Sequence, residues 1–515
     1  MTTAPQVPPT ASSVLVSSSK YLNNAVVRDW IATHTLRRDG PDRVTYSDNF
    51  VFNRELARMR DNEGFDALVE AERKTNPALD HWLAEGFISK MSAADLKACA
   101  PGTVGGIYLG YITGMGIEVN VGFDFNVKNH HDFFNMRHSQ NHDFDHIVTG
   151  GPFTLPTEMV PVWAMLSNYF VHLDPAIAAA HHARTLLGST RFMPRAVLHY
   201  PASFPAFLES MEHGIRVGLA SDPMYLYRYD DVLHMTPAEA RRHLGVREVI
   251  EIDPEKALLA AKHYGEPDPE GRAARAWVED VARGIPHNRR GVRHVDTDSS
   301  VLVSSSKYLN SARLRHWAGT QFLRKNGRDC SLADDLLELD AALAEVRDTR
   351  RIEALFDAEC RGNEALRQWL AARPAGQSQF EFFEARMRAT EAAQRRLCGA
   401  GADSLGGVVL DWATLANVFR HISPALAGEL QVRTMLAAMR ILYRAILHYP
   451  QTWLTLIHAI QKGLRIGRVS DCLFMMPFEE VAQLPVEEAR ERLGIREVGP
   501  DLDTGAMSKI FDMAG

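Results

Sequence analysis

The feature that most constrains the fold of this chain is an internal duplication of its sequence. The segment SSVLVSSSKYLN begins at Ser12 and recurs at Ser299, 287 residues later. Further along, RAVLHYP from Arg195 returns as RAILHYP from Arg444, and here the spacing is 249 residues. A repeat of this length indicates one structural unit used two times, so we expect two similar domains. The second copy has lost 38 residues from its middle, the difference between the two spacings.

Helix signals dominate both copies. Asp174 precedes Pro175 as an N-cap residue precedes a first-turn proline, and Gly245 follows the last periodic residues of its helix. Alternation typical of a strand is confined to Glu118 to Val121. The sequence predicts a mainly α protein in which two tandem homologous helical domains pack as an intrachain pseudo-dimer.

The repeat also sets the expected segment boundaries. We expect, in order, a flexible N-terminus, a first domain (copy one), a charged linker, a second domain (copy two) and a C-terminal tail, over residues 1–11, 12–254, 255–298, 299–500 and 501–515.

Composition excludes several other classes of protein. Hydrophobic residues at 46% and charged residues at 23% are ordinary globular values. A net charge of −7 offers no basic field for nucleic acid. The five cysteines are odd in number and never spaced as CxxC, so we expect neither a disulfide framework nor a thiolate zinc site. The N-terminus lacks the basic start and apolar block of a signal peptide, and a cytoplasmic protein is expected.

One apolar stretch allows two interpretations. Residues 98–117 carry no charge and space Gly106, Gly110 and Gly114 four apart. Such a stretch can be a membrane span or a close-packed helix whose glycines let another backbone approach. Pro101 and the many small residues lower its hydropathy, which favours the close-packed helix.

A cluster in copy one carries metal-ligand chemistry. His138, His142 and His146 are spaced four apart, which places their imidazoles along one helix face. Asp143 lies beside them, and glycines and prolines then break the helix, so an antiparallel return would bring Glu158 over the histidines. Imidazole and carboxylate ligands suit zinc, iron, manganese or cobalt better than calcium or copper(I). His138 is a candidate fifth ligand or outer-shell partner.

An HxxxH pair alone is weak evidence, because two of 21 histidines often share a helix face by chance. Copy two supplies an internal comparison. On the 249-residue spacing, the four candidate ligands are replaced there by Glu391, Ala392, Arg395 and Gly407. None is kept, although the flanking apolar segments are, so the pattern indicates a lost site on a retained scaffold.

These residues resemble a known family. The string HDFDH from His142, followed by eleven residues and Glu158, matches the HDxxHx11E motif of the fourth protein of the yeast coenzyme Q (ubiquinone) biosynthesis series and its bacterial relatives. PGTVGGIYLGYI from Pro101 is similar to that family's PGSLG-then-YL segment, and ARRHLGV resembles its closing RxxLxI element. The resemblance covers most of copy one but only the C-terminal half of copy two.

The resemblance implies a mainly α-helical protein with a divalent metal, zinc first among the candidates. Its ligands and catalytic residues would be His142, Asp143, His146 and Glu158. It further implies a polyprenylated aromatic or isoprenoid lipid in an apolar tunnel, other quinone-biosynthesis enzymes as partners, and peripheral contact with the inner membrane. The implied activity is a metal-dependent lyase reaction, the oxidative decarboxylation of a polyprenylated hydroxybenzoate ring at C1. The resemblance also implies a role in organising the other pathway enzymes, either in addition to this reaction or in place of it.

Two other functions stay open. One is a non-catalytic isoprenoid-lipid scaffold in which the metal holds a head group and copy two offers a docking surface. The other is an HD-type metal-dependent hydrolase, which also uses an adjacent His-Asp pair but needs further His and Asp ligands. No GxGxxG or P-loop pattern is present, so no nucleotide or flavin is expected.

Overall fold

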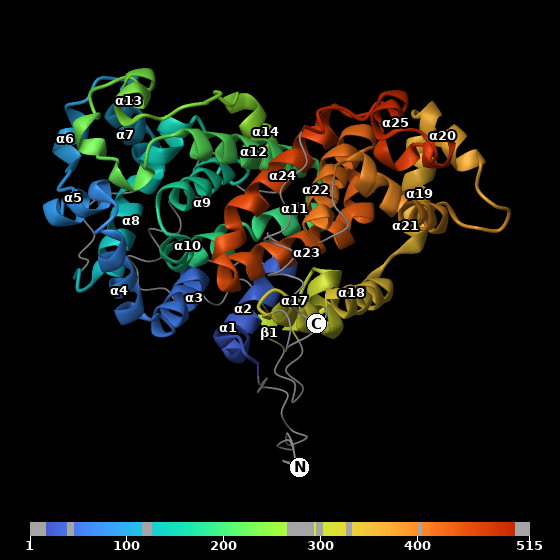
Figure 1. Cartoon of the computed structure of the whole chain (residues 1–515), viewed down its shortest axis with the longest axis horizontal. Helices are drawn as coiled ribbons and strands as arrows, with labels where there is room; N and C mark the ends of the chain where they lie inside the picture. Colours follow the sequence, from blue (N-terminus) through green and yellow to red (C-terminus); the bar gives the residue numbers. More distant parts are fainter. Residues whose placement is uncertain are drawn as a thin grey trace, which may run out of the picture.

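Helices make up nearly all of the regular structure, which confirms a mainly α protein (Figure 1). The computed structural model describes residues 17–38, 46–115, 126–264, 293–294, 302–325, 332–399 and 404–499. The possible strand at residues 118–121 lies outside them.

Copy one supplies the helices at the blue to green end of the colour bar. Its α-helices are α1 (Lys20–Asn23), α2 (Ala25–Leu36), α3 (Tyr46–Arg58), α4 (Asn62–Glu72), α5 (Pro77–Glu85), α6 (Ala93–Lys97), α7 (Val104–Met115), α8 (His130–Thr149), α9 (Met159–His172), α10 (Pro175–Ser189), α11 (Phe192–His199), α12 (Phe204–Ala220), α13 (Pro237–Leu244) and α14 (Pro254–His263). Short 3-10 helices follow at η1 (Pro201–Ser203), η2 (Met224–Leu226) and η3 (Tyr229–Asp231). Helix α14 continues past the expected domain boundary at residue 254.

Copy two supplies the yellow to red helices. They are α16 (Lys307–Asn310), α17 (Ala312–Gln321), α18 (Leu332–Val346), α19 (Thr349–Cys360), α20 (Glu364–Ala371), α21 (Gln379–Leu397), α22 (Ser404–His421), α23 (Pro424–His448), α24 (Trp453–Val469) and α25 (Val486–Leu493), with 3-10 helices η5 (Pro450–Thr452), η6 (Leu473–Met475) and η7 (Phe478–Val481). The strands β1 (Arg293–His294) and β2 (Leu302–Val303) form a small antiparallel pair before it.

The helix ends follow the signals in the sequence. The Asp174 side chain accepts a hydrogen bond from the backbone N–H of Ala176, with Pro175 in the first turn of α10. Gly245 caps α13 in the left-handed conformation, at φ 71°. These are the polar N-cap and glycine C-cap that the free backbone groups of helix ends require.

The structure locates the 38-residue loss. Helix α20 of copy two corresponds to α5 of copy one, and α21 corresponds to α8, so the lost residues lie between these two pairs of helices. Trp82 packs on Phe133 with ring centroids 4.7 Å apart and an interplanar angle of 54°. Trp369 packs on Phe382 with the same distance and angle. The first ring of each pair lies before the loss and the second lies after it. Copy two therefore lacks α6 and α7, and the 249-residue spacing holds from Phe133 onward.

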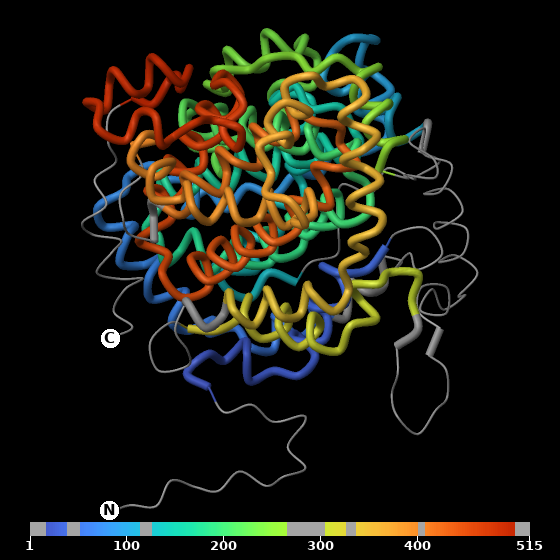
Figure 2. Tube along the Cα trace, turned by 90° about the vertical axis from the view of Figure 1, so that its right-hand side faces the viewer, coloured from blue at the N-terminus to red at the C-terminus, as the bar shows by residue number. Residues whose placement is uncertain are grey.

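The two copies touch through reciprocal contacts. The Ser19 hydroxyl donates to the Leu323 carbonyl at 2.7 Å, and the equivalent Ser306 hydroxyl donates to the Leu36 carbonyl, also at 2.7 Å. Helices α2 and α17 pack together at this junction, where the blue and yellow helices meet in Figures 1 and 2. Such paired contacts are what a pseudo-dimer would contain. The symmetric arrangement itself stays a prediction.

Helix α24 of copy two also packs on α9 of copy one. Trp453 is fully buried, and its indole N–H donates to the Leu166 carbonyl at 2.8 Å. Its ring lies 5.3 Å from that of Phe170. The equivalent rings, Phe204 and Phe419, are 4.7 Å apart, so an aromatic pair occurs twice at this junction.

The apolar helix α7 fulfils one expectation and fails another. No described helix combines the length and the apolar content needed to cross a bilayer. The close approach expected at Gly110 is wrong, because a Cβ there would meet no atom within 4 Å. The close approach expected at Gly106 is confirmed, because a Cβ there would meet the backbone of Ala100. Gly105, beside it, also lies close to another segment, since a Cβ there would lie 3.2 Å from the Leu233 carbonyl oxygen.

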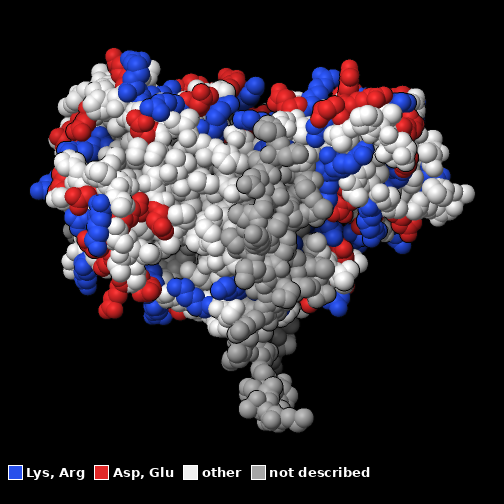
Figure 3. All heavy atoms as spheres, in the orientation of Figure 1, with Lys and Arg blue, Asp and Glu red and all other residues white. Residues whose placement is uncertain are grey.

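The surface carries charged side chains of both signs, and the described cysteines are not joined in disulfides. On the face shown in Figure 3, acidic and basic side chains are interspersed around the edges, and the middle carries few of either. Within the described part of the chain, Cys99, Cys360, Cys398 and Cys472 are free thiols.

Candidate metal centre

The candidate centre is formed by one helix and the start of the next. Helix α8 carries the histidines and ends at Gly150, whose φ of 81° lies in the left-handed region that favours glycine. The chain then reverses through a short turn, and Glu158 stands at the N-cap position of α9. Gly151 lies inside this turn, where a Cβ would come within 2.9 Å of the Val160 side chain. The glycine pair and the prolines therefore make the antiparallel return that the sequence predicts.

Three of the candidate ligands meet at one point. The Glu158 carboxylate places Oε1 3.0 Å from Nε2 of His142 and Oε2 3.0 Å from Nε2 of His146. One ligand atom from each of these residues lies within 4.8 Å of the others. His146 is buried, while His142 and Glu158 are half-buried, so the group is reached from one side.

The hydrogen bonds around this group suit a metal ion. Nδ1 of His146 lies 3.0 Å from the Gly151 carbonyl oxygen. A carbonyl only accepts hydrogen bonds, so Nδ1 donates to it, and Nε2 is the nitrogen turned toward Glu158, where a metal would bind. Two imidazole nitrogens and a carboxylate are a donor set that zinc, iron, manganese and cobalt accept. The residues present therefore fit a divalent metal.

Electrostatics at the centre point the same way. Burial lowers the pKa of His142, but the charge of Glu158 and its hydrogen bond outweigh this and raise that pKa to about 9. Burial raises the pKa of Glu158, yet the charges and hydrogen bonds of His142 and His146 hold it well below its usual range. The Glu158 carboxylate is thus ionised, and its negative charge favours a positive charge between it and the two imidazoles. A divalent ion can take the place of the proton on His142.

Asp143 is not brought to the same point. Among the described residues, the metal-type cluster around Glu158 does not include it. Its Oδ2 instead lies 3.4 Å from the Tyr108 hydroxyl of α7, which donates to it. Successive helix residues point about 100° apart, so a residue directly after His142 is turned away from that histidine's face. Asp143 therefore links the motif to α7 rather than joining the three ligand atoms.

His138 belongs to a different group. It lies on the same face as the other two histidines, and its ring centroid is 5.9 Å from that of His142. Eight residues separate it from His146, a rise of about 12 Å along a helix, too far for both to share one ion. His138 joins His181 and His182 instead.

Aromatic rings cover the centre from α7 and from the turn. Phe153 stacks on the His146 ring with centroids 4.7 Å apart, and Tyr111 stacks on Phe153 at 3.6 Å. Because copy two lacks α6 and α7, it lacks the counterpart of Tyr111. The lost segment therefore supplied part of the wall of this centre.

Copy two fills the equivalent place with an ion pair. Arg395, at the position of His146, pairs with Glu391, at the position of His142, at 2.9 Å. Gly407 stands at the position of Glu158, and a Cβ there would lie 3.3 Å from the Arg395 guanidinium. A cationic side chain thus occupies the space that a metal would occupy in copy one. Among the described residues of copy two, no group of the kind formed by His142, His146 and Glu158 occurs.

Sequence reasoning missed two further groups. One is Asp145, which accepts a hydrogen bond from the Tyr229 hydroxyl at 2.5 Å; burial raises its pKa to about 7, although that bond lowers it. The other is the pair His181 and His182 on α10. Comparison with copy two could have found both, because it has Gln394 in place of Asp145 and Leu-Gln in place of the two histidines.

Comparisons with known proteins leave the family open. No family model matches the chain, and no curated protein matches it. One solved structure, from Nostoc punctiforme PCC 73102 and described as a "Putative ubiquinone biosynthesis protein", aligns over 45% of this chain and 100% of its own, with 16% identity and a TM-score of 0.31. A likeness with this identity and TM-score does not assign a family or a function to the present chain.

Proposed function

We propose that copy one is a metal-dependent protein of ubiquinone or related prenyl-quinone biosynthesis, acting at C1 of a polyprenylated hydroxybenzoate ring. The observation that carries this proposal is the convergence of His142, His146 and Glu158 within a motif that matches HDxxHx11E residue for residue. The ion pair in copy two adds to it, because the same scaffold persists there without the ligands.

The residues of the candidate metal centre have different roles in this proposal. His142, His146 and Glu158 would hold the metal, and the hydrogen bond from His146 to the Gly151 carbonyl fixes the direction of its free nitrogen. A divalent metal bound there supplies Lewis-acid stabilisation of negative charge on a ring carboxylate or phenolate. Phe153 and Tyr111 stack beside the His146 imidazole and form an apolar wall next to the metal position, which suits an aromatic ligand.

The scaffold interpretation has one observation in its favour. Copy two contains a cavity of about 680 Å³ lined by both charged and apolar side chains, although it lacks the ligand set. A cavity of that size can hold a small amphipathic molecule. It would let copy two bind a ligand or a partner segment while copy one carries the metal.

The HD-type hydrolase is disfavoured by the position of Asp143. Such a site needs the adjacent His-Asp pair to point at the same metal. Here the Asp143 carboxylate contacts the Tyr108 hydroxyl and lies outside the group around Glu158.

The ligand can be tested directly on the purified full chain. We expect a 4-hydroxybenzoate with a polyprenyl chain to bind about tenfold or more tightly to zinc-loaded protein than to chelator-stripped protein, a difference of about 1.4 kcal/mol. Calorimetric titration measures both affinities. A polyprenyl alcohol without the ring is the control, and its affinity should not depend on the metal. Equal affinities of the ring compound in both states would contradict a metal-bound head group.

A further inference from the structure

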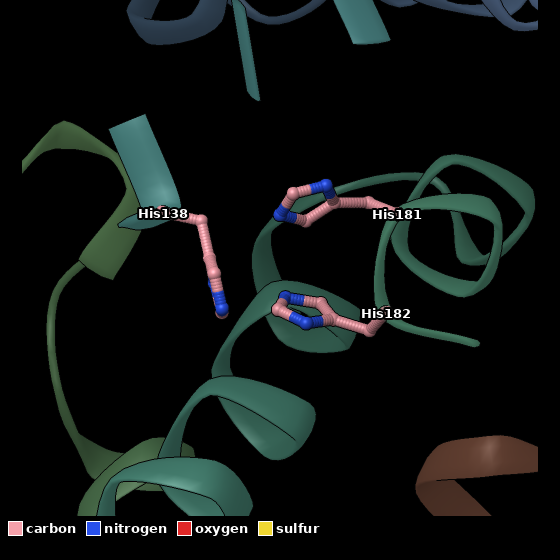
Figure 4. A group of neighbouring side chains, drawn as sticks. All are labelled: His138, His181 and His182. Atoms are coloured by element: carbon pink, nitrogen blue, oxygen red, sulfur yellow. The ribbon is translucent and has the colours of Figure 1, made fainter. Parts of the chain in front are cut away.

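A second cluster of imidazoles lies beside the candidate metal centre. His138 comes from α8, and His181 and His182 come from α10 (Figure 4). The three rings turn toward a common space, and one nitrogen from each lies within 4.8 Å of the others. Their exposed fractions are 8%, 3% and 0%. The cluster is thus buried in the interior of copy one.

Nothing within the described protein satisfies most of these nitrogens. Nδ1 of His138 and both ring nitrogens of His181 and of His182 are buried without a hydrogen-bond partner. A buried polar atom left unpaired costs about 1–3 kcal/mol. Five such atoms lie on three neighbouring rings, whereas buried polar atoms in a packed core are normally paired. One group that binds an imidazole nitrogen from each of the three rings would satisfy three of these polar atoms at once.

The neighbouring His131 shows what a structural histidine looks like here. Its ring lies 6.0 Å from that of His181, yet its Nδ1 is bonded to the Asn135 amide at 2.5 Å and its Nε2 lies 3.4 Å from the Ala180 carbonyl. The same helices can therefore satisfy a buried imidazole with protein partners. They do so for His131 and not for the three clustered rings.

We infer that His138, His181 and His182 form a second site for a divalent transition metal, next to the centre at Glu158 and distinct from it. Imidazole nitrogen is a ligand for zinc, copper, iron and nickel. Three protein ligands leave one position of a tetrahedral ion open.

The electrostatic surroundings define what the open position takes. Burial lowers the pKa of each of the three imidazoles, and nearby Arg184 lowers it further, so the rings are neutral and keep their lone pairs. Neutral ligands leave the charge of a divalent ion uncompensated in the interior. The fourth ligand is therefore an anionic oxygen, such as hydroxide or the carboxylate of a bound molecule.

Copy two again provides the comparison. Met387, Leu430 and Gln431 stand at the positions of His138, His181 and His182. All three line the 680 Å³ cavity, together with the Glu391 and Arg395 pair that replaces the first centre. Copy two has thus lost both groups of ligands at one place in the fold. Joint loss is expected if the two groups serve one function.

The test is equilibrium dialysis of the full chain against zinc, with metal content measured by elemental analysis. The double variant His181→Leu/His182→Gln introduces the residues of copy two. We expect two equivalents in the unmodified chain and one in this variant. The matched control is His131→Phe, which introduces the copy-two residue Phe380 and should keep both equivalents. Equal zinc content in the double variant and the unmodified chain would overturn the second site.

A second measurement keeps the inference testable if the double variant fails to fold. His138→Met removes one imidazole and also copies the second domain. We expect about tenfold or more weaker binding of one equivalent, together with a changed visible spectrum of the cobalt-loaded protein. An unchanged spectrum and affinity would overturn the site. Because Glu158→Gln removes the other equivalent, failure of one centre is distinguishable from failure of the other.

Discussion

Replacing Glu158 by glutamine is expected to remove one equivalent of metal from the full chain. The carboxylate is the only anionic ligand in the group with His142 and His146, and both of its oxygens lie 3.0 Å from an imidazole nitrogen. A neutral amide cannot supply that charge. Loss of an outer-shell partner already weakens metal binding about 10–100-fold, so loss of this ligand should weaken it by about 100-fold or more.

The matched control lies at the equivalent place in copy two. Glu391→Gln removes a carboxylate from the same position of the repeat as His142, but there it pairs with Arg395. We expect this variant to keep the full metal content. Dialysis with elemental analysis measures both variants. An unchanged metal content in Glu158→Gln, or a loss in Glu391→Gln, would contradict the assignment of the centre to copy one.

Truncating Trp453 to alanine is expected to reduce the free energy of unfolding by about 3–5 kcal/mol. The side chain is fully buried and donates its indole N–H to the Leu166 carbonyl of the other copy. The substitution therefore leaves a cavity at the junction of α24 with α9 and removes the hydrogen bond between the two copies. Urea unfolding followed by far-UV circular dichroism measures the loss.

The control variant for this junction is Trp453→Phe. It introduces the residue that copy one has at the equivalent position, Phe204, which packs on Phe419. It should cost less than half as much as the alanine variant, because most of the ring is kept. A cost within about 0.5 kcal/mol for Trp453→Ala, typical of surface positions, would show that the two copies do not stabilise each other here.

The junction also suggests what the second copy does. Glu158 stands at the start of α9, and α24 of copy two packs along this helix. Copy two can therefore support the helix that positions a ligand while having no ligand set of its own. This interpretation agrees with the retention of its apolar segments.

The sequence predicted the features that depend on local pattern. The duplication predicts two similar helical units, and the capping residues Asp174 and Gly245 predict where two helices begin or end. The four-residue spacing of His142 and His146 predicts that both imidazoles lie on one face of a helix. The break after α8 predicts the return of Glu158. Each of these follows from the geometry of one helix and the turn after it.

Features that depend on packing between distant segments could not be predicted in this way. His181 and His182 approach His138 only because α10 packs against α8, and no spacing within either helix shows this. Asp143 is next to a ligand in sequence but is rotated away from the group and bonded to Tyr108. Side-chain direction, rather than sequence distance, decides which neighbours of a motif take part in it.

The most direct test of the proposed function is the quinone content of cells in which the gene is deleted and replaced by the double variant His142→Ala/Glu158→Ala. The unmodified gene provides the positive control, and immunoblotting verifies that the variant accumulates. We predict that the variant restores no quinone and that the prenylated ring still bearing its carboxylate accumulates. Full restoration of quinone by a variant without this metal would contradict a catalytic centre and favour the scaffold.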